Sequence, residues 1–171
     1  PNADEIAAAN VKESVEAATL NDTLYGYPMT ADNGYFMYYN KEYFSEDDVK
    51  SLDKMLSIAA ANNKKVAMEF DSGWYLYTFF GNTGLSLSKP DGITNECNWN
   101  SQTGDITGAA IKQALNSIAA NPGFVSMPNG DIAEHIKSGD VIAGISGVWD
   151  VMNVKEAWGE NYGACKLPTY T

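Results

Sequence analysis

A short apolar run that ends abruptly in a helix start constrains this sequence most. The run VAMEF, residues 66–70, has the composition of a strand in the middle of a sheet. Residues 71–73, Asp-Ser-Gly, break the run, and Asp or Ser is a favourable cap for a new helix. The predicted helix continues to Gly84. Because open α/β sheets bind ligands where strand ends lead into helices, this junction is the first candidate for a site.

Aromatic side chains crowd the helix that starts at this junction. Trp74 and Tyr75 lie in its first turn, beside the carboxylates Glu69 and Asp71, and we expect them to form one wall of a ligand site. The later apolar residues are expected in the core: Leu76, Phe79 and Phe80. The simpler alternative is that all of these rings are core residues.

The rest of the chain alternates strands with helices, which is typical of the α/β class. Further strands are predicted at residues 24–28, 35–39, 141–145 and 162–167. Helices are predicted at residues 3–18, 46–61 (begun by a Ser45 and Asp48 capping box), from Thr107 onward, and from Asp131 to Lys137 before Gly139. Residues 85–105 are polar and rich in turn residues, so we expect a surface hairpin there.

Composition excludes several functional classes. The chain has 171 residues, enough for one domain or one large lobe. Its net charge is −11 and it contains no arginine, so nucleic-acid recognition is not expected. No apolar run reaches the roughly 20 residues that a membrane helix needs. Cys97 and Cys165 are too few for a zinc ribbon, and their spacing leaves both a disulfide and two thiols open.

A second tryptophan, Trp149, also follows a buried strand and precedes a helix, next to Asp150. Indole rings at neighbouring strand ends would give flat apolar platforms that suit the apolar face of a sugar ring. Sugar hydroxyls also need oxygen acceptors around such a platform. The candidates near loop ends are Asp32, Asn33, Glu69, Asp71 and Asp150. Core tryptophans with solvated carboxylates are the alternative reading.

Enzymatic interpretations have less support in the sequence. The single histidine, His135, lies on a short polar helix, and Gly144-Ile-Ser-Gly147 lacks the spacing of a serine nucleophile elbow. No phosphate-binding, metal-binding or redox motif occurs, so no cofactor is expected. A glycoside-active domain that uses Asp71 and Asp150 as paired carboxylates stays open as an alternative, as does a purely structural domain.

Several segments, taken in order, resemble a known family. They are LYGYPMT, YFMYYNKEYF, KVAMEFDSGWYLYTFFGNTG, ITGAAIKQALNSIA, GDIAEHIKSGDVIAGISGVWDV and YGACKLPTYT. Together they are similar to the central part of maltose-type extracellular solute-binding proteins. That resemblance implies a three-layer α/β lobe of the periplasmic-binding-protein type II fold, with a mixed or parallel sheet flanked by helices.

The resemblance also implies a function. Such proteins bind a sugar, here expected to be maltose or a maltooligosaccharide, between two lobes and deliver it to the membrane permease of an ABC importer without chemistry. Trp149 would stack on a sugar ring, and Trp74 and Tyr75 would line the aromatic wall. Asp32 or Asn33 would bind hydroxyls, as would Asp71 or Ser72 just before the wall. The implied location is extracellular, as a cell-surface lipoprotein or in the periplasm.

Finally, the resemblance implies an incomplete receptor. Residues 1–24 would be a helical remnant of the first lobe, and residues 25–171 the second lobe without its C-terminal helices. Helix 3–18 would then pack on this lobe, or on a neighbouring copy to form a dimer, and so cover surface left bare.

Overall fold

The computed structural model of the chain describes residues 2–30, 33–81 and 83–171. Asp32, one of the predicted site residues, lies outside these ranges. Within them, none of the helices has both the length and the apolar character needed to cross a membrane.

A five-stranded mixed sheet, with strand order β7-β4-β8-β3-β9, organises the fold. Its central strand β8 (Val141–Gly147) is buried along its whole length, as its nearly continuous apolar sequence predicts. It pairs parallel with β4 (Lys65–Met68) and antiparallel with β3 (Tyr35–Asn40). Strand β7 (Phe124–Ser126) lies parallel beside β4, and β9 (Tyr162–Cys165) lies antiparallel beside β3. The predicted strands of this sheet are confirmed to within a few residues.

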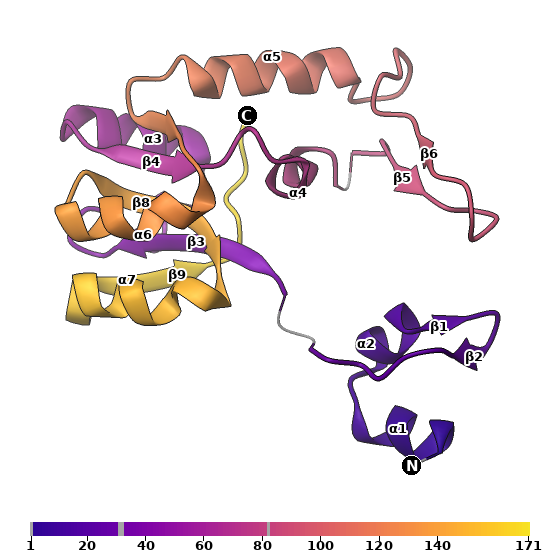
Figure 1. Ribbon diagram of the computed structural model, residues 1–171. Helices are drawn as coiled ribbons and strands as arrows, with labels where there is room; N and C mark the ends of the chain where they lie inside the picture. Colours follow the sequence, from indigo (N-terminus) through magenta and orange to yellow (C-terminus); the bar gives the residue numbers. More distant parts are fainter. Residues whose placement is uncertain (1, 31–32, 82) are drawn as a thin grey trace.

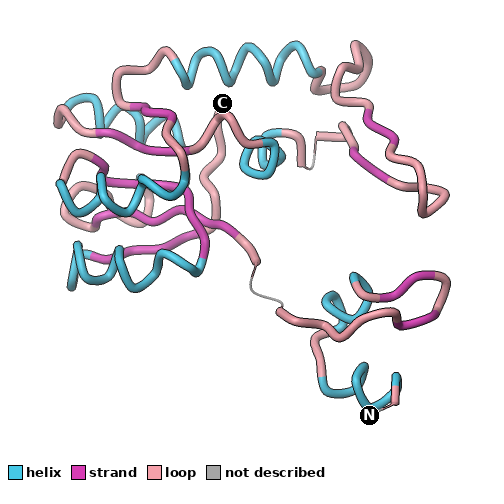
Figure 2. Tube along the Cα trace, in the orientation of Figure 1, coloured by secondary structure: helices cyan, strands magenta, loops and turns pink. Residues whose placement is uncertain are grey.

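Helices cover both faces of the sheet and complete three layers (Figures 1 and 2). On one face, α3 (Leu52–Ala61) and α5 (Gly108–Ala119) pack on one set of side chains from the strands. On the other face, α6 (Asn129–Ser138) and α7 (Val151–Trp158) pack on the alternate set. This separation follows from the two-residue period of a strand: in β3, Met37 and Tyr39 join the first cluster and Tyr38 the second. The predicted three-layer α/β class is confirmed.

The N-terminal segment differs from the prediction. The single helix expected at residues 3–18 is two short helices, α1 (Ala3–Ala9) and α2 (Lys12–Ala17), because the Asn10 side chain bonds back to the Ile6 carbonyl and ends the first. In place of the strand predicted at residues 24–28, β2 (Thr23–Leu24) pairs with β1 (Thr19–Leu20).

Of the two packings predicted for this segment, packing on this lobe is wrong, whereas packing on a neighbouring copy stays a prediction. Neither α1 nor α2 contains a buried residue, and Figure 1 shows the segment apart from the main sheet. One contact joins the segment to the rest of the chain: Leu20 Cδ1 lies 3.8 Å from the position that a Cβ atom on Gly92 would take.

Two helix starts also differ from the expected positions. The helix predicted at residues 46–61 is split into the turn η1 (Asp48–Lys50) and α3, because Ser51 is extended and bridges to Thr169. The predicted capping box is confirmed, since the Asp48 N–H donates to Ser45 Oγ and the Ser45 N–H to Asp48 Oδ2. Helix α6 begins at Asn129, with Asp131 inside its first turn rather than at its cap, and Gly139 ends it as predicted.

The aromatic segment after β4 is shorter as a helix than predicted. It forms one α-helical turn, α4 (Gly73–Leu76), and one 3-10 turn, η2 (Tyr77–Phe79). The expected surface hairpin follows, with strands β5 (Leu87–Ser88) and β6 (Glu96–Cys97). Behind the hairpin, the Trp99 ring stacks on Phe80 with 4.0 Å between centroids.

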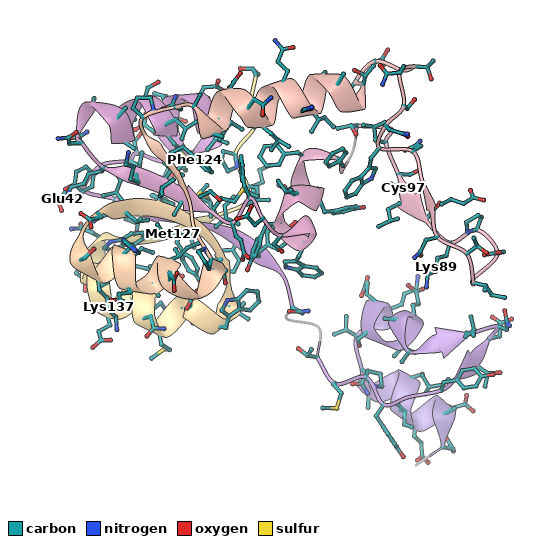
Figure 3. The ribbon with its side chains drawn as sticks, turned by 45° about the horizontal axis from the view of Figure 1, so that its top comes forward. Glu42, Lys89, Cys97, Phe124, Met127 and Lys137 are labelled. Carbon is teal, nitrogen blue, oxygen red and sulfur yellow. The ribbon has the colours of Figure 1, made fainter. Side chains whose placement is uncertain are left out.

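The two cysteines are free thiols in separate parts of the fold. Cys97 lies on the exposed hairpin (Figure 3), whereas Cys165 is half-buried in β9. Burial raises the pKa of the Cys165 thiol above its usual value. The sequence left open whether the two cysteines form a disulfide or remain thiols, and in the structure both are thiols.

Candidate ligand-binding site

Trp74 and Trp149 follow two strands that lie side by side. Strand β4 leads into α4, and the parallel strand β8 leads into the turn η3 (Val148–Asp150). Trp74 is 50% exposed and Trp149 is 46% exposed, so neither ring is a core residue. Parallel strands end at the same edge of a sheet, so both indoles belong to one edge, as the sequence predicts.

Tyr35 connects the two chain segments that carry the indoles. It is the first residue of β3 and pairs in register with Gly147, two residues before Trp149. Its ring meets Trp74 edge to face, with 5.7 Å between centroids, and its hydroxyl donates to the Trp74 carbonyl oxygen at 2.9 Å. The aromatic contact therefore fixes the first turn of α4 against the start of β3.

Trp149 is held at its edge and at its face. Its Nε1–H donates to Asn129 Oδ1 at 3.0 Å. Its ring lies so close to Gly147 that a Cβ atom on that residue would be 2.2 Å from the ring carbons. A glycine at this position is therefore required for the ring to adopt this orientation.

A largely half-buried polar cluster adjoins Trp149. Ser146 is 0% exposed, and its Oγ–H donates to Asp150 Oδ2 at 2.5 Å. Ser146 Oγ also lies 3.3 Å from Asn129 Oδ1, the oxygen that accepts from Trp149. The Asn129 N–H donates to Glu69 Oε2 at 3.1 Å. The cluster brings the carboxylates of Glu69 and Asp150, predicted at separate strand ends, around one asparagine.

Tyr75 occupies the core instead of an exposed wall. It is 5% exposed, belongs to the main core cluster, and packs on Tyr35 with 5.1 Å between ring centroids. Burial, together with the negative charges of Glu69 and Asp150, raises the pKa of Tyr75 to about 12. Tyr75 was expected beside Trp74 in the wall of the site, but its ring is buried, because this side of the α4 turn faces the sheet.

The other predicted residues surround the same edge or precede it. Asp71 is exposed and Ser72 half-buried between β4 and α4, although the Ser72 side chain makes no capping bond. Asp150 is half-buried in η3. Asn33 is exposed just before β3, and its predicted neighbour Asp32 lies outside the described residues.

Several residues of this site were not among the sequence-based candidates, Asn129 and Tyr35 among them. The one sequence feature that could have indicated Asn129 is its position as a polar residue directly after Pro128, at the start of a helix. Tyr35 was predicted only as the first residue of a strand, and its half-buried position there gives it a contact with Trp74. Among the described residues, no group of three or more His, Cys, Asp or Glu side chains is placed to hold a metal ion.

An apolar groove of about 610 Å³ lies elsewhere, between α5, η2 and the C-terminal residues. Its polar side chains are hydroxyls and no charged side chain lines it. The indole edge, by contrast, combines exposed rings with carboxylates, which is the pairing that a polyhydroxylated ligand requires. We therefore place the candidate site at the indole edge. The groove lining is Leu52, Thr78, Phe79, Gly81, Thr83, Ile106, Ala110, Ile111, Ala114, Ile145, Leu167, Pro168, Thr169 and Tyr170.

Several solved proteins have a fold similar to that of this chain. A protein solved with acarbose is 34% identical, with a TM-score of 0.80, over 99% of this chain and 43% of its own. The maltodextrin binding protein MalE1 from L. casei BL23, solved without ligand, is 26% identical, with a TM-score of 0.74, over 100% of this chain and 44% of its own. The extracellular solute-binding protein from Staphylococcus aureus in complex with maltose shares the fold at 16% identity, with a TM-score of 0.71, over 93% of this chain and 43% of its own.

The chain thus spans less than half the length of these solved proteins. A comparison with curated proteins gave no match. The model of a family described as bacterial extracellular solute-binding protein matches residues 1–170. This match extends over almost the whole sequence, and the chain belongs to the family of bacterial extracellular solute-binding proteins.

Proposed function

We propose that this chain binds a carbohydrate of the maltose and maltooligosaccharide class on the exposed indoles of Trp74 and Trp149. The observation that carries the proposal is the pair of half-exposed indoles at adjacent strand ends, with carboxylates behind and beside them. Trp149 is the stacking platform in this proposal, and Trp74 extends it.

Sugar recognition fits the chemistry of this edge. The CH face of a pyranose ring stacks on an indole, while its hydroxyls require acceptors such as carboxylates at the rim. The rim candidates are Asp71, Ser72, Asp150 and Asn33, together with Asp32, which lies outside the described residues. Glu69 joins them because one of its oxygens accepts from Asn129 beside Trp149.

The comparisons support a carbohydrate over other solutes. Two of the similar structures carry acarbose or maltose in their descriptions, and another is described as a maltodextrin binding protein. We extend this ligand class to the present chain because the indole edge supplies the matching surface. Binding without chemistry is part of the proposal, and the family description supports a binding role.

For a two-lobed protein that would include this chain, we propose transport. A sugar would bind between two lobes, the lobes would close by a hinge motion, and the closed form would deliver the sugar to the permease of an ABC importer. The family description places its members outside the bacterial cytoplasm. A periplasmic position, or attachment to the cell surface as a lipoprotein, is the finer part of this proposal.

Tryptophan fluorescence tests the carbohydrate proposal. The chain is titrated with maltotriose up to tens of millimolar, and the same titration is run on Trp149→Ala. We expect a saturable change in the original chain. We expect at least about tenfold weaker binding in the variant, because losing roughly 50–100 Å² of apolar contact removes about 1.3–2.5 kcal/mol.

Ile93→Ala is the matched control, since Ile93 is 84% exposed on the distant hairpin and its truncation should leave binding unchanged. Circular dichroism of each variant reports whether it has folded. Equal binding by the original chain and a folded Trp149→Ala variant would show that the indole is not the platform.

A further inference from the structure

Asn129 makes contacts with three separate parts of the site. Its Oδ1 accepts from the Trp149 indole at 3.0 Å, and its Nδ2 donates to the Ile145 carbonyl oxygen of β8 at 3.1 Å. Its backbone N–H donates to the Glu69 carboxylate at the end of β4. One residue, through its side chain and its backbone N–H, thus joins the start of α6 to two strands and to the candidate platform.

These contacts fix the orientation of the amide group. Because Nδ2 is the only donor end of the amide and is used by a backbone carbonyl, Oδ1 must face the indole and the Ser146 hydroxyl. The Ser146 proton is directed to Asp150 at the shorter distance. The amide oxygen therefore remains available to accept from Trp149.

Gly147 restricts the ring from its other side. A Cβ atom at this residue would lie 2.2 to 2.5 Å from carbons of the Trp149 ring, far inside contact distance. The ring therefore lies directly against the backbone of β8. Contact at the ring face and a hydrogen bond at the ring edge together define one rotamer for a side chain that is otherwise 46% exposed.

We propose that Asn129 is a positioning residue that holds Trp149 in its ligand-stacking orientation before any ligand arrives, with Gly147 providing the space. A ring that is already fixed loses little rotamer freedom on binding, so preorganisation strengthens affinity without a new ligand contact. The effect on affinity rests on the proposed carbohydrate function. The effect on the orientation of the ring in the ligand-free chain does not depend on that function.

The first test examines the ring in the absence of ligand. In a ¹H–¹⁵N spectrum, the chain's tryptophans give separate indole N–H signals, assigned by single Trp→Phe variants. Asn129→Ala should move the Trp149 signal and speed exchange of its indole proton with solvent, while the signals of Trp99 and Trp158 stay in place. An unchanged Trp149 signal in folded Asn129→Ala would overturn the inference. Gly147→Ala repeats this test from the opposite side of the ring should Asn129→Ala fail to fold.

The second test measures coupling in a double-mutant cycle. Asn129→Ala should weaken maltotriose binding roughly 2- to 10-fold, the range for one lost hydrogen bond. Trp149→Phe keeps an aromatic platform but lacks the N–H, so Asn129→Ala should have almost no further effect in that background. An equal loss in both backgrounds would show that Asn129 acts through another route and would overturn its positioning role.

The two tests separate the two claims. If the original chain shows no maltotriose binding, the carbohydrate proposal fails, and the ligand-free spectra still decide whether Asn129 fixes the ring. If maltotriose binds but the Trp149 indole signal is the same in the original chain and in Asn129→Ala, the carbohydrate proposal is supported and the positioning role of Asn129 is refuted.

Discussion

At the scale of single residues, close backbone approaches make some glycines indispensable. Gly123 follows α5 and crosses α3 so closely that a Cβ atom would lie 2.1 Å from the Leu56 carbonyl oxygen. That oxygen belongs to the backbone of a packed helix, so it cannot move aside as the end of a flexible side chain does. The Gly123 carbonyl also accepts from the Val66 N–H at 2.7 Å, which ties the same segment to β4.

Gly123→Ala should therefore lower the free energy of unfolding by about 1–3 kcal/mol, the usual effect of overpacking. Gly130 is the matched control, because nothing lies within 4 Å of the position that its Cβ would take. Gly130→Ala should leave the free energy of unfolding unchanged or raise it by about 0.4–1 kcal/mol, because alanine lowers the conformational entropy of the unfolded chain. Urea unfolding of both variants measures the difference, and equal stabilities would contradict the close approach.

The sequence predicts the two indoles better than the residues around them. Trp74 and Trp149 follow strand ends, and a strand end is visible in the amino-acid pattern. Tyr75 was misplaced because neighbouring residues of a helical turn point about 100° apart, and nothing in the sequence says which of two aromatic residues faces inward. The role of Asn129 depends on contacts with Trp149 and Ile145, which only the folded chain brings to it.

At the scale of elements, an ion pair joins η1 to the first turn of α3. Asp48 lies in η1, and Lys54 Nζ of the following helix is 2.6 Å from its Oδ1. The hydrogen bond from Lys54 chiefly, and then the bonds from the Ser45 hydroxyl and N–H, lower the pKa of Asp48 from 3.8 to about 2. The folded state therefore favours the ionised carboxylate more than the unfolded state does.

A group with a lowered folded-state pKa stabilises the fold above its unfolded pKa and loses that effect as the pH falls to the folded value. For Asp48 this window runs from about pH 4 to about pH 2. Asp48→Asn should reduce the pH dependence of the unfolding free energy within the window. Lys54→Gln, which removes only the ion-pair partner, should reproduce part of the reduction. Thermal unfolding at several pH values checks both, and an unchanged slope in Asp48→Asn would refute the assignment.

Elements were predicted well where local sequence determines them and poorly where distant segments intervene. The buried strands and the helix capped by Thr107 match, because apolar runs and a capping hydroxyl are local signals. The helix predicted at residues 46–61 was wrong at Ser51, which is drawn into an extended conformation by Thr169, far along the chain. The helix expected at residues 3–18 lacked any core to stabilise its middle.

At the scale of the whole molecule, the candidate platform is an open surface. The chain covers 43% to 44% of the length of its similar solved proteins, and its two indoles are half-exposed. A complete two-lobed receptor with a Kd of about 1 μM would have a binding free energy of about −8 kcal/mol. If this lobe supplies roughly half of it, the Kd of the chain alone is about 1 mM.

A titration with maltotriose followed by ¹H–¹⁵N nuclear magnetic resonance tests the carbohydrate platform most directly, because it reports each indole separately. The indole signals of Trp74 and Trp149 should shift together and saturate with a Kd near about 1 mM. Those of Trp99, stacked behind the hairpin, and of Trp158, buried in the core, should stay in place. Maltotriose that leaves both platform signals unmoved at tens of millimolar, or that shifts only Trp99 or Trp158, would contradict the proposed site.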